Sequence, residues 1–219
     1  MHCFGAKAKE WNESQKQYTT LYEVTFRNAN LTDAIMNVDE NLSIIDCSKN
    51  WRYADVEMMN AMISGGSYRL FENILNELEK NFDYILIDTE PKKSVVVFRI
   101  LSAIDEVIIP FTLTKFSVLG AMDMVDYIKN TKDKYNPNLK IKAFVPMIVA
   151  PRSKTESGFL ENFNQINFSI PNIRLANTKI PRSTSGENSL TIKGAPVTLV
   201  SKNKLAKAYE ALVEELEDL

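Results

Sequence analysis

The segment from Phe82 to Pro91 carries the residues of this chain that are best suited to chemistry. Asp83 leads into four apolar residues that favour β-structure, Asp88 ends the run, and Pro91 stops its continuation. A run that is apolar on both faces is typical of the buried middle of a parallel sheet. Asp88 would then lie at the carboxyl end of its strand, where open α/β sheets bind their ligands. A carboxylate there can support a magnesium ion beside bound phosphates.

A phosphate-binding site also needs a loop whose backbone N–H groups surround the phosphates, and the sequence contains no segment that would form one. Phosphate loops use closely spaced glycines, so that backbone N–H groups approach the phosphates, followed by a lysine. The chain has seven glycines, and none of them begins such a loop. Gly65-Gly66-Ser67 comes nearest, but no lysine follows and a predicted helix precedes it. We interpret that segment as a turn.

Elements that would position Asp88 alternate between strand and helix along most of the chain, which is typical of βαβ units around a parallel sheet. We expect strands at 41–47, 83–88, 106–110 and 139–149, the last interrupted at Pro146, and an extended stretch at 173–180. We expect helices at 31–36, 54–63, 68–79, 94–103, 117–132, 156–166 and 205–216. The predicted fold class is α/β, with a mostly parallel, doubly wound sheet and helices on both faces. Residues 1–20 are expected to be a poorly defined amino-terminal segment, and residues 21–219 to form one α/β domain.

Composition and residue spacing argue against several classes of function. The net charge of −2 gives no whole-chain electrostatic case for nucleic-acid binding, although a local basic face remains open. Cys3 and Cys47 have no metal-binding spacing and His2 is the only histidine, which argues against a structural zinc site. No 18-residue apolar run and no signal-peptide core are present, so we expect a reduced, cytoplasmic protein with no membrane partner.

The order of segments after Asp88 resembles the ParA/MinD family of deviant-Walker ATPases, specifically the ParA branch that partitions plasmids and chromosomes. The likeness extends over roughly residues 20–219. It rests on the following segments in this order: Asp88-Thr89-Glu90-Pro91, Glu106-Val107-Ile108-Ile109-Pro110, Phe116-Ser117-Val118-Leu119-Gly120, Asn136-Pro137-Asn138, Ile180-Pro181-Arg182-Ser183, Lys193-Gly194-Ala195-Pro196-Val197 and Ala206-Lys207-Ala208-Tyr209-Glu210-Ala211-Leu212. The resemblance implies a P-loop NTPase-like fold whose amino-terminal P-loop strand, with the Walker A segment, is missing here.

Particular roles follow from that resemblance. Asp88 stands where the family has the Walker B aspartate that supports magnesium, and Thr89 matches the threonine that follows it. Pro181 and Arg182 belong to the segment that lines the adenine pocket in the family. Glu90 replaces a proline; it could repel phosphates, help to hold a cation, or lie in a solvated loop, and we favour the loop. ATP and magnesium are the implied cofactors, with no cofactor as the alternative for this chain.

Basic residues in the last third of the chain match the region through which ParA relatives bind DNA without sequence preference. The candidates are Arg152, Lys154, Arg174, Lys179, Arg182 and Lys193, joined by Lys202, Lys204 and Lys207. An ordinary solvated surface is the alternative. Phe159, Phe163 and Phe168 have the spacing of core residues rather than of base-stacking residues.

Loss of the P-loop strand has a structural consequence as well. In the family this strand lies between the Asp88 strand and the one matching 106–110, so its removal leaves two buried strand edges unpaired. The two strands could close on each other, residues 1–12 or another chain could fill the slot, or the chain could be a shortened form of a longer ATPase. A shortened form of a longer ATPase explains the missing P-loop strand with the fewest assumptions.

The leading interpretation is a ParA-like partition protein. The family activity would be ATP-dependent dimerisation and non-specific DNA binding, with a ParB-like centromere-binding partner, a homodimer and nucleoid association. ATP binding is expected to be impaired, and no catalytic residue is assigned, because no stabiliser of γ-phosphate charge is evident. One alternative is a non-enzymatic ParA paralogue or remnant that binds a partner ATPase or DNA. A more distant alternative is an unrelated doubly wound enzyme with Asp88 and Glu90 as a metal-binding pair.

Overall fold

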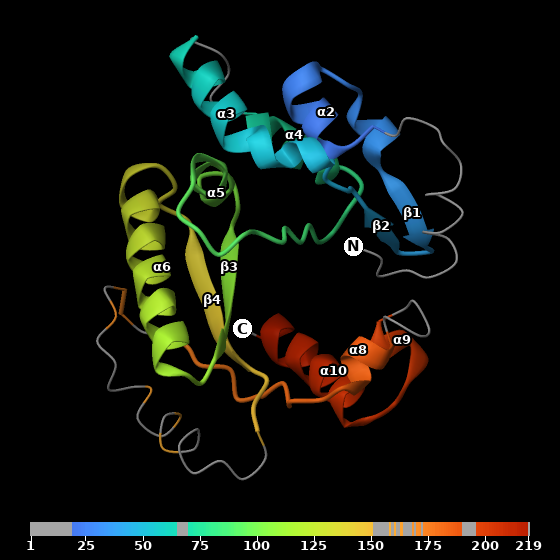
Figure 1. Cartoon of the computed structure of the whole chain (residues 1–219), viewed down its shortest axis with the longest axis vertical. Helices are drawn as coiled ribbons and strands as arrows, with labels where there is room; N and C mark the ends of the chain where they lie inside the picture. The colour runs from blue at the N-terminus through green and yellow to red at the C-terminus, as the bar shows by residue number, and fades with distance from the viewer. Residues whose placement is uncertain are drawn as a thin grey trace. The chain divides into compact units, whose positions relative to one another are not determined.

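The structure, a computed structural model, describes residues 19–64, 70–150, 158, 160, 163, 168, 170, 171, 173–189 and 196–218. These residues form two compact units, one between residues 19 and 103 and the other between 104 and 218 (Figure 1). The predicted helix at 156–166 and nearly all of the predicted amino-terminal segment lie outside the described residues.

The first unit begins with short elements whose ends are capped by side chains. Thr20 and Glu23 form a capping box at the start of the first helix, and the Asn30 side chain accepts from the Thr32 N–H, as its position before a predicted helix suggested. That second helix is a single 3-10 turn, and the prediction of helix through residue 36 is wrong because Met36 already belongs to an antiparallel hairpin. The elements are α2 (Leu21–Arg27), η1 (Leu31–Ala34), β1 (Met36–Asp39) and β2 (Leu42–Ile44).

Helices make up the rest of the first unit. The predicted helices at 54–63, 68–79 and 94–103 are confirmed as α3 (Ala54–Ile63, after η2, Lys49–Tyr53), α4 (Leu70–Leu78) and α5 (Val95–Leu101). The apolar face of α4 is buried at Phe71, Leu75 and Leu78. Trp51 packs edge-on against Phe71 with ring centroids 6.3 Å apart.

The prediction of a buried strand at 83–88 is wrong. This segment is drawn as coil between α4 and α5 in Figure 1, and it pairs with neither of the two sheets that the described residues form. Its side chains alternate as in a strand, since Ile85 and Ile87 are half-buried whereas Tyr84 and Leu86 are 74% and 88% exposed. The apolar run set the backbone preference, but a strand exists only through a paired neighbour, and the described chain supplies none.

The second unit is built on a parallel pair of strands, β3 (Glu106–Thr112) and β4 (Lys140–Met147), joined by α6 (Lys115–Lys134). Residues 173–182 add to the other edge of β4 through bridges from Leu175 to Phe144 and from Pro181 to Val149. The expected interruption at Pro146 is wrong, because β4 continues through it. Proline cannot donate a hydrogen bond, but the Pro146 carbonyl accepts from the Ile180 N–H at 2.9 Å.

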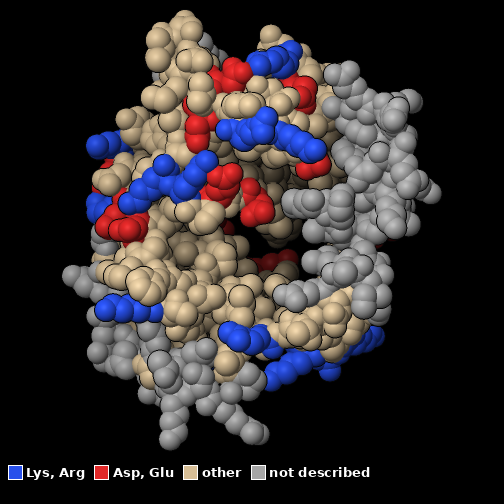
Figure 2. Space-filling view, in the orientation of Figure 1, with Lys and Arg blue, Asp and Glu red and all other residues tan. Residues whose placement is uncertain are grey.

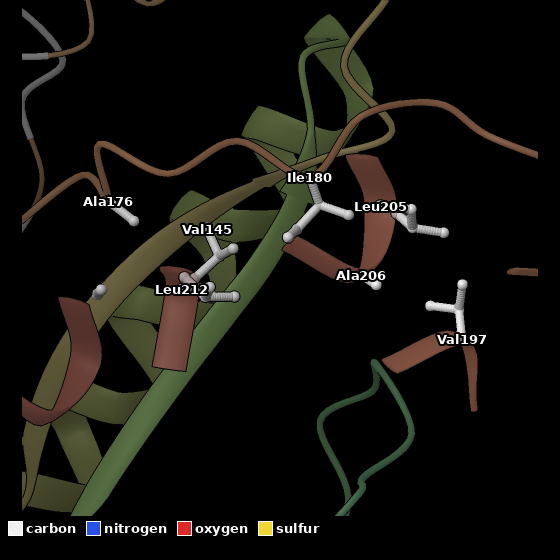
Figure 3. Packing of buried hydrophobic residues seen from close by; sticks show 8 residues of the cluster. Val145, Ala176, Ile180, Val197, Leu205, Ala206 and Leu212 are labelled. Atoms are coloured by element: carbon white, nitrogen blue, oxygen red, sulfur yellow. The ribbon is translucent and has the colours of Figure 1, made fainter. Parts of the chain in front are cut away.

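The core of the second unit joins β4 to the carboxyl-terminal helices α9 (Val197–Val200) and α10 (Lys204–Glu217), which follow the short helix α8 (Ser185–Asn188) in the chain. Figure 3 shows Val145 of β4 beside Leu212 of α10, with Ile180 near Leu205 and Ala206. On the other side of the strands, Phe144 packs edge-on against Phe163 and at a tilt against Phe168, so the prediction that these two aromatics pack rather than bind bases is confirmed. Phe159 lies outside the described residues. α6 and α10 lie on opposite sides of β3 and β4 (Figure 1).

Candidate functional site

Asp88 and Thr89 lie in the first unit, on the extended segment that leads into α5. Both are exposed, and within the part of the chain that the structure describes neither makes a hydrogen bond or an ion pair. An exposed carboxylate with no protein partner is available to a cation or to water. The position therefore suits the metal-supporting role that the sequence predicts for Asp88.

Glu90 is an ion-paired loop residue. Its carboxylate lies 2.6 Å from the Lys92 ammonium, which also lies 3.3 Å from the Asp55 carboxylate of α3. The hydrogen bonds that the Lys92 ammonium donates to Glu90 and then to Asp55 raise the pKa of Lys92. The interpretation of Glu90 as a solvated loop carboxylate agrees with its 63% exposed side chain, although its ion pair with Lys92 was not predicted.

Asp55 links this loop to the start of α5. Its Oδ1 accepts a hydrogen bond from the Val96 N–H at 3.0 Å, beside the Ser94 hydroxyl that accepts from the Val97 N–H at 3.2 Å. Burial raises the pKa of Asp55, but hydrogen bonds from Val96, Ser94 and Lys92 outweigh it, so the net shift of the pKa is downward. The loop between Asp88 and α5 is therefore held at its carboxyl end by a charged anchor, which we call the Asp55 anchor (Asp55, Lys92 and Ser94).

Pro181 and Arg182 lie in the second unit, at the end of β4. The Val149 N–H donates to the Ile180 carbonyl and the Arg182 N–H donates to the Val149 carbonyl, both at 3.0 Å, so backbone pairing fixes this segment. Ile148, next to this pairing, has a φ of 58°, a left-handed conformation that is rare for a β-branched residue. The Arg182 side chain is exposed.

Three of the predicted DNA-binding residues lie on one extended segment of the second unit. Arg174, Lys179 and Arg182 are all exposed between residues 173 and 182. Arg152, Lys154 and Lys193 lie outside the described residues. Figure 2 shows further Lys and Arg side chains gathered at the lower edge, over the region of α8 to α10; Lys202, Lys204 and Lys207 at the start of α10 are exposed.

The Glu215 carboxylate on α10 holds the segment that carries Arg174, Lys179 and Arg182. Glu215 accepts hydrogen bonds from the backbone N–H groups of Asn177 and Thr178 at 2.7 Å and 2.8 Å. Burial raises the pKa of Glu215, but the hydrogen bonds from Asn177 and Thr178 prevail and the pKa is lowered overall. The segment that carries Arg174, Lys179 and Arg182 is thus held between β4 on one side and α10 on the other.

Sequence reasoning missed both anchoring carboxylates. Asp55 and its partner Val96 are 41 residues apart, and Glu215 lies 38 residues from Asn177. No local pattern links residues at such separations. The only local signal was Ser94 before the apolar run of α5, which is the position of a helix N-cap.

The residues present fit one side of a magnesium–nucleotide site only. Asp88 supplies an exposed carboxylate for a cation, but no segment of the sequence has the glycines and lysine of a phosphate loop. Among the described residues no group of three or more His, Cys, Asp or Glu side chains could hold a metal ion. In the same part of the chain, no helix is long and apolar enough to cross a membrane.

Comparison with known proteins agrees with the family resemblance that the sequence shows. A family model described as an AAA domain matches residues 4–141. A ParA family protein of Mycoplasma pneumoniae is 27% identical over 182 residues, covering 83% of this chain and 59% of that protein. The chromosome partitioning protein ParA of Caulobacter vibrioides is 27% identical over 130 residues, covering 58% of this chain and 48% of that protein. The chain thus spans less than two thirds of the length of these relatives.

Similarity to a solved structure extends over nearly the whole chain. McdA of Cyanothece, in its apo form, superposes with a TM-score of 0.78 at 19% identity, covering 93% of this chain and 80% of that one. At this level of identity the likeness concerns the fold. It confirms the predicted α/β fold class.

Proposed function

We propose, because the chain belongs to the ParA/MinD-like family of P-loop ATPases, that it acts as a ParA-like protein in the partitioning of plasmid or chromosomal DNA. The observation that carries this proposal is the alignment of most of the chain with proteins named for ParA. Action in the cytoplasm, a homodimer and a ParB-like partner are part of the same proposal.

On the nucleotide side, we assign Asp88 to magnesium and Thr89, Pro181 and Arg182 to nucleotide binding. When bound, the metal would neutralise phosphate charge. Asp88 is suited to this role because it is exposed and free of protein partners within the described residues. No residue of the sequence supplies the phosphate cradle, so we propose that ATP binding is impaired and we derive no hydrolytic step.

On the DNA side, the charge distribution of α10 supports phosphate contacts. Lys204 and Lys207 lie in its first two turns, no acidic residue occupies the first turn and no basic residue occupies the last. This order opposes the helix dipole, which favours acidic residues at the amino end and basic ones at the carboxyl end. Helix stability therefore does not explain the lysines, whereas contact with a polyanion does.

The test is binding to a fluorescent 24-base-pair duplex of mixed sequence, with and without Mg-ATP. Replacing Lys204 and Lys207 together by Gln should weaken binding by about tenfold or more, because two phosphate contacts are lost. Lys134→Gln, which removes an exposed lysine from α6, is the matched control and should leave affinity nearly unchanged. Equal affinity for the parent and the double variant would refute DNA binding through α10.

A second candidate function is a non-enzymatic ParA paralogue that binds DNA or a partner ATPase. The absence of a glycine-rich phosphate loop from the sequence favours it. The two candidates differ in the same assay: Mg-ATP should strengthen DNA binding by a nucleotide-responsive ParA-like protein and leave that of the paralogue unchanged. Calorimetric titration decides the nucleotide question directly, and micromolar affinity for Mg-ATP that is lost in Asp88→Ala would contradict the proposed impairment.

A further inference from the structure

The extended segment 173–182 departs from regular pairing with β4. The Ala176 N–H donates to the Phe144 carbonyl at 2.8 Å, and the Ile180 N–H donates to the Pro146 carbonyl at 2.9 Å. The segment therefore advances from position 176 to position 180 while β4 advances only from 144 to 146, so the segment bulges between these two hydrogen bonds. A bulge of this kind can re-aim a side chain of the strand that contains it.

Glu215 of α10 holds the backbone of the bulge. Its Oε1 accepts from the Asn177 N–H at 2.7 Å and from the Asn177 side-chain amide at 3.2 Å, and its Oε2 accepts from the Thr178 N–H at 2.8 Å. N–H groups that leave a sheet ladder need another acceptor, and a carboxylate makes the stronger, charge-assisted kind of hydrogen bond. Glu215 thus fixes the conformation of the bulge.

Lys179 is the basic residue that the bulge carries, and its side chain is exposed. It lies between Thr178, which Glu215 holds, and Ile180, which is hydrogen-bonded to β4. The backbone on both sides of Lys179 is therefore fixed before any ligand binds. Such preorganisation lowers the entropy cost of binding through this lysine.

The start of α10 brings two further lysines to the same region. Figure 3 shows Ile180 near Leu205 and Ala206, and all three are buried in one apolar cluster. No acidic residue occupies the first turn of α10. The exposed lysines that adjoin these three residues in the chain are Lys179, Lys204 and Lys207.

The charge of Glu215 makes its place beside this basic region informative. A carboxylate near a polyanion-binding surface weakens binding by its charge alone. We propose that Glu215 is a positioning residue for DNA binding: it holds the bulge so that Lys179 contacts phosphates of the same duplex as Lys204 and Lys207. This inference rests on the proposed DNA binding through α10.

The first test measures affinity of the full chain for the same fluorescent duplex at pH 7. Glu215→Ala should weaken binding by about threefold, as should Lys179→Gln, because each removes one phosphate contact. Glu214→Ala removes the same charge at an exposed neighbour and should bind as tightly as the parent or slightly more tightly. The sign of the effect is decisive, since loss of charge alone predicts tighter binding for both glutamate variants.

A double variant tests whether Glu215 acts through Lys179. Lys179→Gln combined with Glu215→Ala should bind no more weakly than Lys179→Gln alone, because the lysine that Glu215 positions is already gone. A further threefold loss in the double variant would overturn the proposal.

Hydrogen exchange measured by NMR tests the bulge itself. In Glu215→Ala, the amide hydrogens of Asn177 and Thr178 should exchange about tenfold faster, as expected for loss of a charged acceptor. The amides of Ala176 and Ile180 are the matched controls and should keep their rates, because their acceptors are carbonyls of β4. Equal acceleration at all four amides would show general loss of the segment and overturn a local positioning role.

Glu215→Gln provides a conservative variant that also serves if Glu215→Ala does not fold. It keeps one acceptor oxygen, so its affinity should lie between those of Glu215→Ala and the parent and below that of Glu214→Gln. A parent chain that does not bind the duplex would refute the proposed DNA binding and this inference with it. A parent that binds, with Glu215→Ala and Glu215→Gln binding at least as tightly, would refute the positioning role alone.

Discussion

At the scale of single residues, Ile148 is the clearest case of local strain. A left-handed backbone costs an L-residue about 1–2 kcal/mol, and glycine avoids that cost. We therefore expect Ile148→Gly to have a higher free energy of unfolding than Ile148→Ala by about 1 kcal/mol, since the two variants differ only in the β-methyl group that alanine keeps. Urea denaturation followed by circular dichroism measures the difference.

A helical position provides the control for this comparison. At Ile63, the last residue of α3, alanine should be the more stable of the two variants by about 1 kcal/mol, the usual helix preference. The same order at both positions would contradict strain at Ile148.

Glu215 is the residue that should make the second unit sensitive to acid. Because its pKa is lowered on folding, its contribution is complete above the unfolded pKa of about 4.3 and is lost as the pH falls through the lower folded value. At pH 7, Glu215→Gln should lower the free energy of unfolding by about 1 kcal/mol, and this difference from the parent should shrink at acidic pH. Urea unfolding at several pH values measures it. Glu214→Gln, at an exposed neighbour, should show no such trend; a difference that stays constant with pH would argue against the carboxylate.

At the scale of elements, the start of α5 depends on the Asp55 anchor. In Asp55→Ala the Val96 N–H loses its acceptor and Lys92 loses one of its two carboxylate partners. We expect exchange of the Val96 amide hydrogen to accelerate by about tenfold, as for the loss of a charged acceptor. Asp33→Ala, at an exposed residue of η1, serves as the control. Unchanged exchange at Val96, measured by NMR, would mean that Ser94 alone holds the helix start.

The start of α10 depends on Asn203, whose side chain accepts from the Ala206 N–H at 2.9 Å. Asn203→Ala should lower the free energy of unfolding by about 1 kcal/mol, as is usual for the loss of an N-cap. Thermal unfolding followed by circular dichroism tests this. Lys202→Ala, one residue earlier and without a cap role, should change it little, and an equal loss in both variants would contradict capping.

At the scale of the whole molecule, a net charge of −2 coexists with a basic start to α10. If Lys202, Lys204 and Lys207 provide three phosphate contacts, DNA affinity should fall by about 40-fold between 50 and 200 mM salt. Titrations of the duplex at four salt concentrations give the slope. An affinity that does not depend on salt would exclude phosphate contacts as its source.

Several elements could be predicted because their signals are local. The apolar spacing in α4 and α10 and the cap residue Asn30 each act within a turn or two of the chain, so the sequence shows them directly. The order of segments after Asp88 likewise predicted the family and the α/β class. Of the candidate site, the family resemblance assigned Asp88 to magnesium; the structure shows that this carboxylate is exposed, and its role stays a prediction.

What only the tertiary structure decided concerns pairing between distant residues. The run ending at Asp88 has the composition of a buried strand, yet whether it becomes one depends on a neighbour that its own sequence does not encode. Asp55 and Glu215 became anchors only when folding brought them to backbone N–H groups far along the chain. Local backbone preference acts within a few residues, whereas hydrogen-bond satisfaction depends on which chain segments meet in space.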